Sequence, residues 1–443
     1  MKIEEINYIK EKVKRFIRND REQLFFYNSA CNVWAPHSGT RAATALQILL
    51  SKEDIQLSAT EAKAVVNELL YDYTFKIPLP EPPKDYINCK NGVLSLKGPH
   101  LLPNSEVNEL EAYFRVQLDF EYQKKLTEEN CPIFMNFLRH ALDIKVDKPD
   151  SILTNASVTR LLEMLGYIVS NEYKAKKLMV ILGPANSGKS QILELVRRVV
   201  GYANTVALTL DELSGQSGGR FRTELLTQAH ALINDELPTN GLKHLSELKK
   251  IIAGEAITIE AKGAKPKTIR NTTKLLFAGN QLPDLAEPDC GNAFASRLCV
   301  VAFKEAAPEN RKNVNLVEEF YGERDAIFTL AVNAFAKMKR NALEFTEDQE
   351  ADAIVQAYMD ENSSVVTFVK DSTVVQPGKG IRTMELYHRY QRYCQQEGLT
   401  PAKDLKAFRQ QLLSIPVIKG IRKGRLTKDN PPCSVVWGIK LVS

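Results

Sequence analysis

Short apolar runs alternate with helically spaced apolar positions through the middle of the chain. The run at 177–182 predicts a buried parallel strand, and residues 191–200 carry apolar side chains at helical spacing. Comparable apolar runs end at Glu236, Asn280 and Phe303. Strands that alternate with helices predict an α/β unit built on a parallel sheet.

The N-terminal part shows a different pattern. Residues 25–27 and 33–34 predict paired strands, residues 60–70 predict a helix, and residues 91–96 predict a further strand. A largely helical segment from about 109 to 169 is expected to lead into the sheet. This mixture predicts an α+β domain that ends in a helical collar.

The last stretch of the chain predicts two helices and a hairpin. Two apolar stripes with helical spacing precede β-forming runs at 417–418 and 435–439. These runs bracket residues 419–428, of which five are basic. A small winged-helix domain fits this order, with one helix in the major groove and the wing on the backbone. The basic positions are Lys406, Arg409, Arg422, Lys423 and Arg425. A packing domain with a solvated basic loop is the alternative.

Three domains are therefore expected. They cover residues 1–150 (N-terminal α+β and helical collar), 151–345 (α/β core) and 360–443 (winged helix). Residues 341–362 are polar and acidic, which is typical of a linker.

Composition places the chain among ordinary globular proteins. Of 443 residues, 44% are hydrophobic and 26% are charged. The sequence contains neither a signal-like apolar segment nor an apolar run that approaches the roughly 18 residues of a membrane span. Seven cysteines are scattered without metal-ligand spacing. We expect a cytoplasmic protein with reduced thiols, no metal cluster and no membrane partner.

Positive charge is concentrated at the C-terminus. Residues 361–443 contain 14 Lys or Arg and 6 Asp or Glu, a net charge of +8, whereas the whole chain carries +5. A basic module on a near-neutral body favours a phosphate-backbone partner over a merely solvated surface.

Residues 183–190 read Gly-Pro-Ala-Asn-Ser-Gly-Lys-Ser and match the phosphate-binding loop G-x-x-x-x-G-K-[ST]. Strand, loop and helix follow in the order that lets backbone N–H groups and a helix N-terminus hold phosphates. This motif predicts that ATP and Mg²⁺ bind here, with Lys189 on the β- and γ-phosphates and Ser190 on the metal. The nucleotide-binding residues are Gly183, Pro184, Ala185, Asn186, Ser187, Gly188, Lys189 and Ser190.

The next apolar run ends in Asp235 and Glu236. Parallel sheets place their ligands at the carboxyl ends of the strands, so Asp235 is expected to hold Mg²⁺ and Glu236 to activate the attacking water. A nucleotide kinase does not need such a base, so this pair favours hydrolysis. An Asp-Glu surface turn explains the same dipeptide.

Two further residues complete the predicted catalytic set. Asn280, after an apolar run, is the right size to hold the attacking water or to contact the γ-phosphate. Arg297, before the last apolar run, is the candidate arginine finger for a neighbouring subunit. An Asn that opens a Pro-containing turn and a strand-capping surface arginine are the alternatives.

A basic hairpin is expected between the second and third catalytic strands. Its β-forming arms flank a tip with Gly, Pro and three lysines, Lys262, Lys265 and Lys267. Lysines at a loop tip can bind phosphates without reading sequence, although a solvated hairpin explains them too.

The order of phosphate loop, Asp-Glu strand, basic hairpin and Asn-ended strand resembles superfamily 3 DNA helicases of viruses, phages and plasmids. The sequence Asn91-Gly92-Val93 and its continuation to Leu96 resemble an element of the phage/plasmid and poxvirus primase–helicase branch. This likeness extends over most of the chain. The chain shows no carboxylate or Cys/His cluster ahead of that element for primer synthesis, so no primase domain is evident.

The resemblance implies an AAA+-like P-loop ATPase core that forms a ring, usually a hexamer, around DNA. It implies 3′–5′ movement on single-stranded DNA, pore lysines at 262, 265 and 267, and duplex contact by the C-terminal domain. The expected function is a replicative helicase and initiator of a phage or mobile element, with a separate primase or accessory protein as partner. The alternative is an origin-binding initiator ATPase that switches assembly without processive unwinding.

Overall fold

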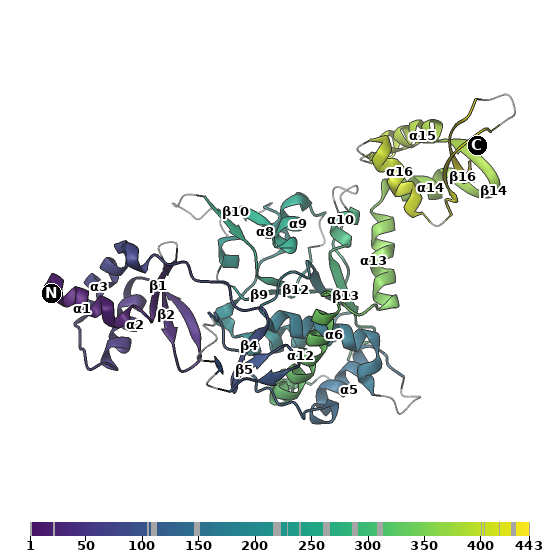
Figure 1. The fold of residues 1–443 in the computed structure, drawn as a ribbon. Helices are drawn as coiled ribbons and strands as arrows, with labels where there is room; N and C mark the ends of the chain where they lie inside the picture. Colours follow the sequence, from purple (N-terminus) through teal and green to yellow (C-terminus); the bar gives the residue numbers. More distant parts are fainter. Residues whose placement is uncertain are drawn as a thin grey trace.

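The computed structural model arranges the chain as three units joined in sequence (Figure 1). It describes residues 2–20, 23–103, 106–107, 113–145, 151–215, 223–227, 229–238, 241–259, 266–285, 291–307, 313–399, 401–402, 404–415, 417–426 and 431–442. None of the helices in these ranges is long and apolar enough to cross a membrane.

The N-terminal unit packs three helices on one face of an antiparallel sheet. Its elements are α1 (Ile3–Val13), β1 (Ile17–Asp20), β2 (Gln23–Asn28), β3 (Val33–His37), α2 (Gly39–Ser51) and α3 (Ala59–Tyr71). The strand order is β1-β2-β3, which confirms the predicted pair. Alternate strand residues such as Leu24 and Phe26 are buried in a core shared with the helices. The helix predicted at 60–70 is confirmed as α3, which begins with a Ser58–Glu61 capping box, whereas α1 and α2 were not predicted.

The segment after this unit differs from the helical prediction. A small sheet of β4 (Tyr86–Cys89), β5 (Gly92–Ser95) and β6 (His100–Leu101) precedes α5 (Pro132–Ala141) and α6 (Ala156–Val169). Residues 113–127 contain no helix. Alternate residues there are buried, namely Phe114, Val116, Leu118, Phe120 and Tyr122. This period of two is the signal of an extended segment, and the prediction of a mainly helical stretch was wrong here.

The central unit is built on a five-stranded parallel sheet with the order β13-β7-β12-β9-β8. The strands are β7 (Leu178–Leu182), β8 (Thr205–Val206), β9 (Ala231–Asn234), β12 (Lys274–Gly279) and β13 (Leu298–Ala302). This sheet confirms the α/β class. The connections contain α7 (Lys189–Val200), α8 (Leu210–Leu213), α9 (Leu245–Ala253), the hairpin β10 (Ala256–Ile259) and β11 (Lys267–Arg270), and α10 (Gly291–Ala295).

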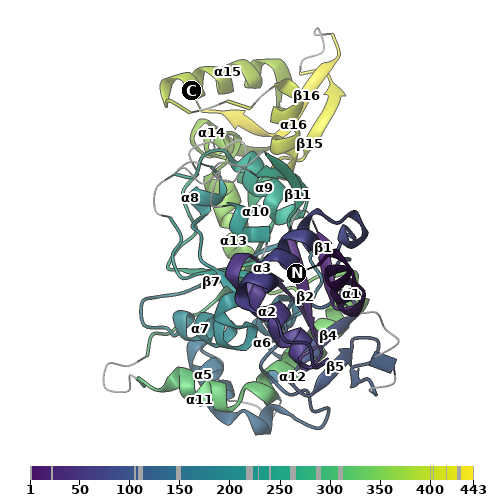
Figure 2. The same cartoon turned by 90° about the vertical axis from the view of Figure 1, so that its left-hand side faces the viewer.

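Both faces of the sheet are buried. Met179 and Ile181 face a core with α6, α7 and α12 (Arg324–Arg340), whereas Leu178 and Val180 face a core with α8 and α9. The first core also contains residues of β4, β5 and α5, so it continues across residue 150. Gly166 lets α6 approach α12 closely, since a Cβ there would stand 2.6 Å from Cβ of Phe335. The helix α11 (Leu316–Gly322) lies with α5 and α12 at the opposite end from the C-terminal unit (Figure 2).

The acidic stretch predicted as a linker contains helix α13 (Gln349–Glu361). Asp348 caps its N-terminus, and Asp352 forms a two-bond pair with the buried Arg160, both bonds at 2.9 Å. Near the other end, the Tyr358 hydroxyl donates to the carbonyl of Pro283 at 2.6 Å. Because these contacts fix one face of the segment to the central unit, acidic composition alone misjudged it.

The C-terminal unit has its own core. Its elements are α14 (Ser364–Ser372), β14 (Thr373–Arg382), α15 (Thr383–Gln396), α16 (Leu405–Ser414), β15 (Gly420–Gly424) and β16 (Cys433–Leu441). The antiparallel sheet has the order β14-β16-β15. Tyr390 of α15 and Phe408 of α16 stack with ring centroids 4.7 Å apart. The two predicted helices are present, and α14 and β14 are additional. A hairpin is present too, but its first arm is β15 and not the predicted run at 417–418, so part of the predicted basic wing lies in a strand.

Candidate functional site

Strand register gathers the predicted catalytic segments at one edge of the central sheet. Leu182 at the end of β7 pairs with Gly279 of β12, and Asn234 at the end of β9 pairs with Phe277. The residues that follow these strands are the 183–188 loop, Asp235 with Glu236, and Asn280. All of them therefore lie at the carboxyl edge, where parallel sheets bind ligands.

The loop depends on two glycines. Gly188 has a φ of +85° and directly precedes α7. A Cβ on Gly188 would stand 2.7 Å from Cζ of Phe137 on α5, and one on Gly183 would stand 2.8 Å from Cβ of Phe303. The loop is therefore packed against aromatic side chains, and its curvature requires glycine at both ends.

Lys189 is the most tightly held polar group of the edge. Its side chain folds back into the loop, where Nζ donates to the carbonyls of Gly183 and Pro184, both at 2.7 Å. Nζ also donates to Oδ1 of Asn280 at 3.2 Å. Burial lowers the pKa of this ammonium group. The contact joins two segments that the sequence places 91 residues apart.

Two carboxylates stand beside this contact. Asp235 and Glu236 are exposed, and among the described residues neither forms an ion pair. The Glu236 backbone N–H donates to Oδ1 of Asn234 at 2.9 Å, which fixes the turn after β9. Free carboxylates next to a lysine and an amide are suited to a cation and a water.

The remaining loop residues leave an open surface. Pro184, Ala185, Asn186 and Ser190 are exposed, while Ser187 is buried. The Ala307 N–H donates to the Asn186 carbonyl at 3.0 Å, which ties the loop to the segment after β13. A glycine-bounded loop at a helix N-terminus, with an inward lysine and an exposed hydroxyl, fits a triphosphate and its Mg²⁺.

Arg297 lies at the opposite edge of the sheet. It directly precedes β13, whose first residue Leu298 pairs with Leu178, the first residue of β7. Its Nη1 donates to the carbonyl of Ala293. The length of β7 separates it from the loop of its own chain, about 13 Å at 3.3 Å per residue. Arg297 therefore lies at the edge of the sheet opposite the loop of its own chain.

The basic hairpin has a regular stem. Ala256–Ile259 pair with Lys267–Arg270 in antiparallel register, with Ile257 and Ile269 buried. Lys262 and Lys265 lie outside the described residues, as does the side chain of Lys267. Their predicted role stays a prediction.

The basic residues predicted for the C-terminal unit are exposed. Lys406 and Arg409 lie on α16, and Arg422 and Lys423 lie on β15, with Arg425 directly after it. None of the five forms an ion pair within the described ranges. Their charges are thus available to an anionic partner.

Phe137 is part of the site but was not predicted. It packs on Gly188 and against Phe303 with ring centroids 5.7 Å apart. Phe137 precedes the loop by about 50 residues, and its helix carries no motif. Only the packing of α5 under the loop identifies it.

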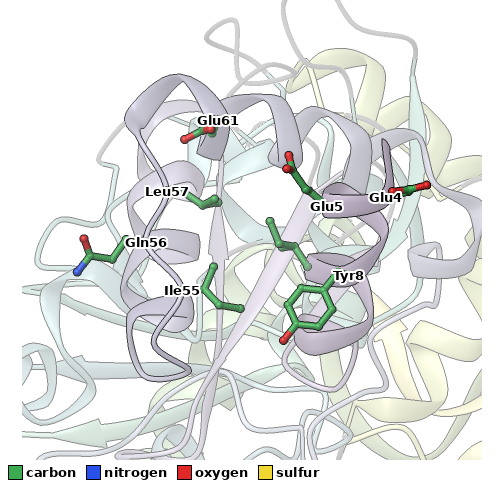
Figure 3. Close-up of a pocket in the computed structure, with 8 residues that line it drawn as sticks. Glu4, Glu5, Tyr8, Ile55, Gln56, Leu57 and Glu61 are labelled. Atoms are coloured by element: carbon green, nitrogen blue, oxygen red, sulfur yellow. The ribbon is translucent and has the colours of Figure 1, made fainter. Parts of the chain in front are cut away.

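Two surface cavities lie away from these residues, in the N-terminal unit. One of about 470 Å³ is lined by α1 and by the residues around the start of α3, where the side chain of Tyr8 lies across from Ile55 (Figure 3). The other, of about 600 Å³, lies between β2, β3 and α2. Neither contains a predicted site residue. The described ranges contain no group of three or more His, Cys, Asp or Glu placed to hold a metal.

Comparison with known proteins gives two family matches. Residues 7–143 match a family described as D5 N terminal like, and residues 181–292 match a family of unknown function, DUF5906. The first match contains the Asn91–Leu96 element, and the second contains the whole 183–190 loop, both carboxylates and Asn280.

Solved structures of the NrS-1 C-terminal region in apo form are similar along their whole length. One is 12% identical with a TM-score of 0.48, covering 97% of this chain and 98% of that chain. A second is 12% identical with a TM-score of 0.45, covering 99% and 100%. At these values the likeness does not by itself establish a shared fold.

Proposed function

We propose that this protein is an ATP-dependent DNA helicase that serves the replication of a phage or mobile element. The contact between Lys189 and Asn280 carries the proposal, because it joins the predicted phosphate loop to the predicted sensor. The D5 N terminal like match over residues 7–143 supports a place among replication proteins of this kind.

Each residue at the carboxyl edge has a distinct task. The loop N–H groups and the start of α7 hold phosphates, and Lys189 leaves its two carbonyl partners to neutralise them. Ser190 and Asp235 hold Mg²⁺, which screens the charge on the phosphates. Glu236 accepts a proton from water, and Asn280 orients that water.

The working form is a ring, most simply a hexamer, in which the site is completed by Arg297 of a neighbour. The placement of Arg297 at the amino edge of its own sheet supports this arrangement. The basic hairpin then faces the pore and holds single-stranded DNA, and α16 with the β15 wing contacts duplex.

Strand displacement tests the proposal. Wild-type protein with ATP and Mg²⁺ is expected to release a labelled strand from a forked duplex, whereas Glu236→Gln binds ATP but releases none. The control is Glu255→Gln, which changes an exposed carboxylate beyond the end of α9. Equal strand release by Glu236→Gln and wild type would overturn the assignment.

One contact favours the alternative of an initiator ATPase that switches assembly. Tyr358 of α13 bonds Pro283, three residues after Asn280, so a shift at the sensor reaches the helix that leads to the C-terminal unit. Under this alternative, DNA stimulates ATP hydrolysis and changes oligomer size, but forked DNA stays paired. Light scattering and strand displacement on one sample separate the two functions.

A further inference from the structure

The sheet of the C-terminal unit has an outer face that its helices do not cover. Val436 and Ile439 of β16 face the core with Tyr390 and Phe408. Residues directly opposed on antiparallel strands project to the same side. The outer face therefore consists of Val435, which is fully buried beneath its neighbours, and the partly exposed Trp437, with their cross-strand neighbours Gly380 and Arg382 on β14 and Gly420 and Arg422 on β15.

Trp437 packs against two glycines of this sheet. A Cβ on Gly380 would stand 3.0 Å from Cε3 of the indole, and one on Gly424 would stand 2.9 Å from Cζ2. The two glycines belong to the strands on either side of β16, so the indole packs closely against a glycine of each neighbouring strand. A residue with a side chain at either position would lift the ring.

Part of the Trp437 side chain remains in contact with solvent. Trp437 is partly exposed, and within the described ranges no aromatic ring or cation stacks on it. The chain contains only one other tryptophan, Trp34, which is 5% exposed. The ring centroids of Trp34 and Tyr27 lie 5.3 Å apart. A partly exposed indole that packs against glycine and has no aromatic partner in the described ranges can stack with a planar group.

Two arginines flank this surface. Arg382 and Arg422 both oppose Val435, one from each neighbouring strand, and their strands lie about 10 Å apart across β16. Both are exposed, and neither forms an ion pair or side-chain hydrogen bond within the described ranges. An aromatic face between free guanidinium groups, in a segment of net charge +8, complements a polyanion with planar groups.

We propose that this outer face binds single-stranded nucleic acid, with a base stacked on Trp437 and phosphates on Arg382 and Arg422. A single strand is required because the bases of a duplex stack on each other and do not offer a free face. The site is separate from α16, which packs on the inner face of the sheet. It shares Arg422 of β15 with the duplex contact proposed above, extends the proposed function with a stacking site for a single strand, and does not depend on ATP hydrolysis.

Fluorescence of the full chain tests the stacking directly. In Trp34→Phe, Trp437 is the sole tryptophan, and the substitution keeps an aromatic ring against Tyr27. Oligothymidylate of about 16 nucleotides, added without nucleotide, is expected to quench this emission saturably. A duplex of the same length is expected to leave it nearly unchanged. Equal quenching by both, or saturable binding of the single strand without quenching, would overturn the proposal.

Binding of labelled oligothymidylate gives the second measurement. Trp437→Leu is expected to weaken binding about tenfold, and Trp437→Tyr to retain most of the affinity. Arg382→Gln and Arg422→Gln are each expected to lower the salt slope by about 0.7. The matched control Arg392→Gln, exposed on α15, leaves affinity and slope unchanged. Wild-type affinity in Trp437→Leu, with unchanged thermal unfolding, would refute the site whether or not the protein hydrolyses ATP.

Discussion

At both edges of the central sheet, lysine side chains donate hydrogen bonds to backbone carbonyls, yet the surroundings of these lysines differ. At the carboxyl edge, Lys189 folds into an exposed glycine-bounded loop beside free carboxylates. At the amino edge, Lys274 is 5% exposed and donates to the Ser170 carbonyl at 2.8 Å, and Lys177 donates to the Ser296 carbonyl at 2.7 Å. The first arrangement can exchange carbonyls for phosphates, whereas Lys274 is sealed in the core.

The comparison shows that neither the residue type nor a carbonyl partner is enough to mark a lysine beside an apolar strand as a site residue. Lys177, Lys189 and Lys274 all adjoin buried strands or their loops and all bond carbonyl oxygens. What separates Lys189 from the other two is its exposed loop beside two carboxylates that form no ion pair within the described ranges, a surface open to a ligand. Arg297 at the amino edge gains a role only if a second copy brings such a surface to it.

The largest effect is expected when one lysine at each edge is replaced by alanine in separate variants. Lys189→Ala is expected to reduce ATP hydrolysis about 10³-fold or more, because the ammonium that meets the phosphate charge is gone. Lys177→Ala removes the same charge at the amino edge and is expected to hydrolyse ATP like wild type. Steady-state phosphate release measures both, and equal losses would erase the distinction between the edges.

Arg297 tests whether the amino edge completes a neighbour's site. Arg297→Ala is expected to lower ATP hydrolysis roughly 10³-fold, while nucleotide binding persists. When the variant is mixed with wild-type protein, ATP hydrolysis should fall by more than the variant's fraction of the subunits. Arg340→Ala, at an exposed position on α12, is the control. Activity strictly proportional to the wild-type fraction would contradict a shared site.

Substitution of Asn280 tests whether this residue acts in hydrolysis or in nucleotide binding. Asn280→Ala is expected to slow hydrolysis about 10²-fold with little change in nucleotide affinity, because it removes the amide that orients water and leaves Lys189 in place. Single-turnover kinetics and a binding titration separate these effects. Gln281→Ala, the exposed neighbouring residue, should behave as wild type. A loss of affinity without a loss of rate would assign Asn280 to binding.

The smallest effect is expected from substitution of Lys274, which should change how the free energy of unfolding depends on pH. Burial lowers the pKa of Lys274 to about 7, and the nearby Glu172 opposes this shift. Between pH 7 and about 10 the unfolded chain binds the extra proton, so stability rises with pH by up to about 1.4 kcal/mol per unit. Urea unfolding at pH 7, 8 and 9 should show this rise in wild type and a flatter dependence in Lys274→Met. The exposed Lys243→Met should keep the wild-type slope. Parallel curves for Lys274→Met and wild type would show that Lys274 is charged inside the fold.

Local patterns were read correctly where spacing alone decides the structure. The strands that became β7, β9 and β12, the helix α7 and the pair β2–β3 follow from periods of two or 3.6 residues and from turn residues. The prediction was wrong for residues 113–127 and for α13. In both, contacts with distant elements decide the structure: Leu118 bridges Cys89, and Asp352 pairs with Arg160.

By itself, the sequence determined that a loop able to hold phosphates joins a buried strand to a helix, and that Asp235, Glu236 and Asn280 each follow an apolar strand. These properties depend on neighbouring residues along the chain. The tertiary structure decided that β12 lies between β7 and β9, which brings Asn280 to Lys189. It also decided that Arg297 faces away and that Trp437 rests on two glycines. Pairing between strands far apart in sequence sets these positions, and no local pattern encodes which strands become neighbours.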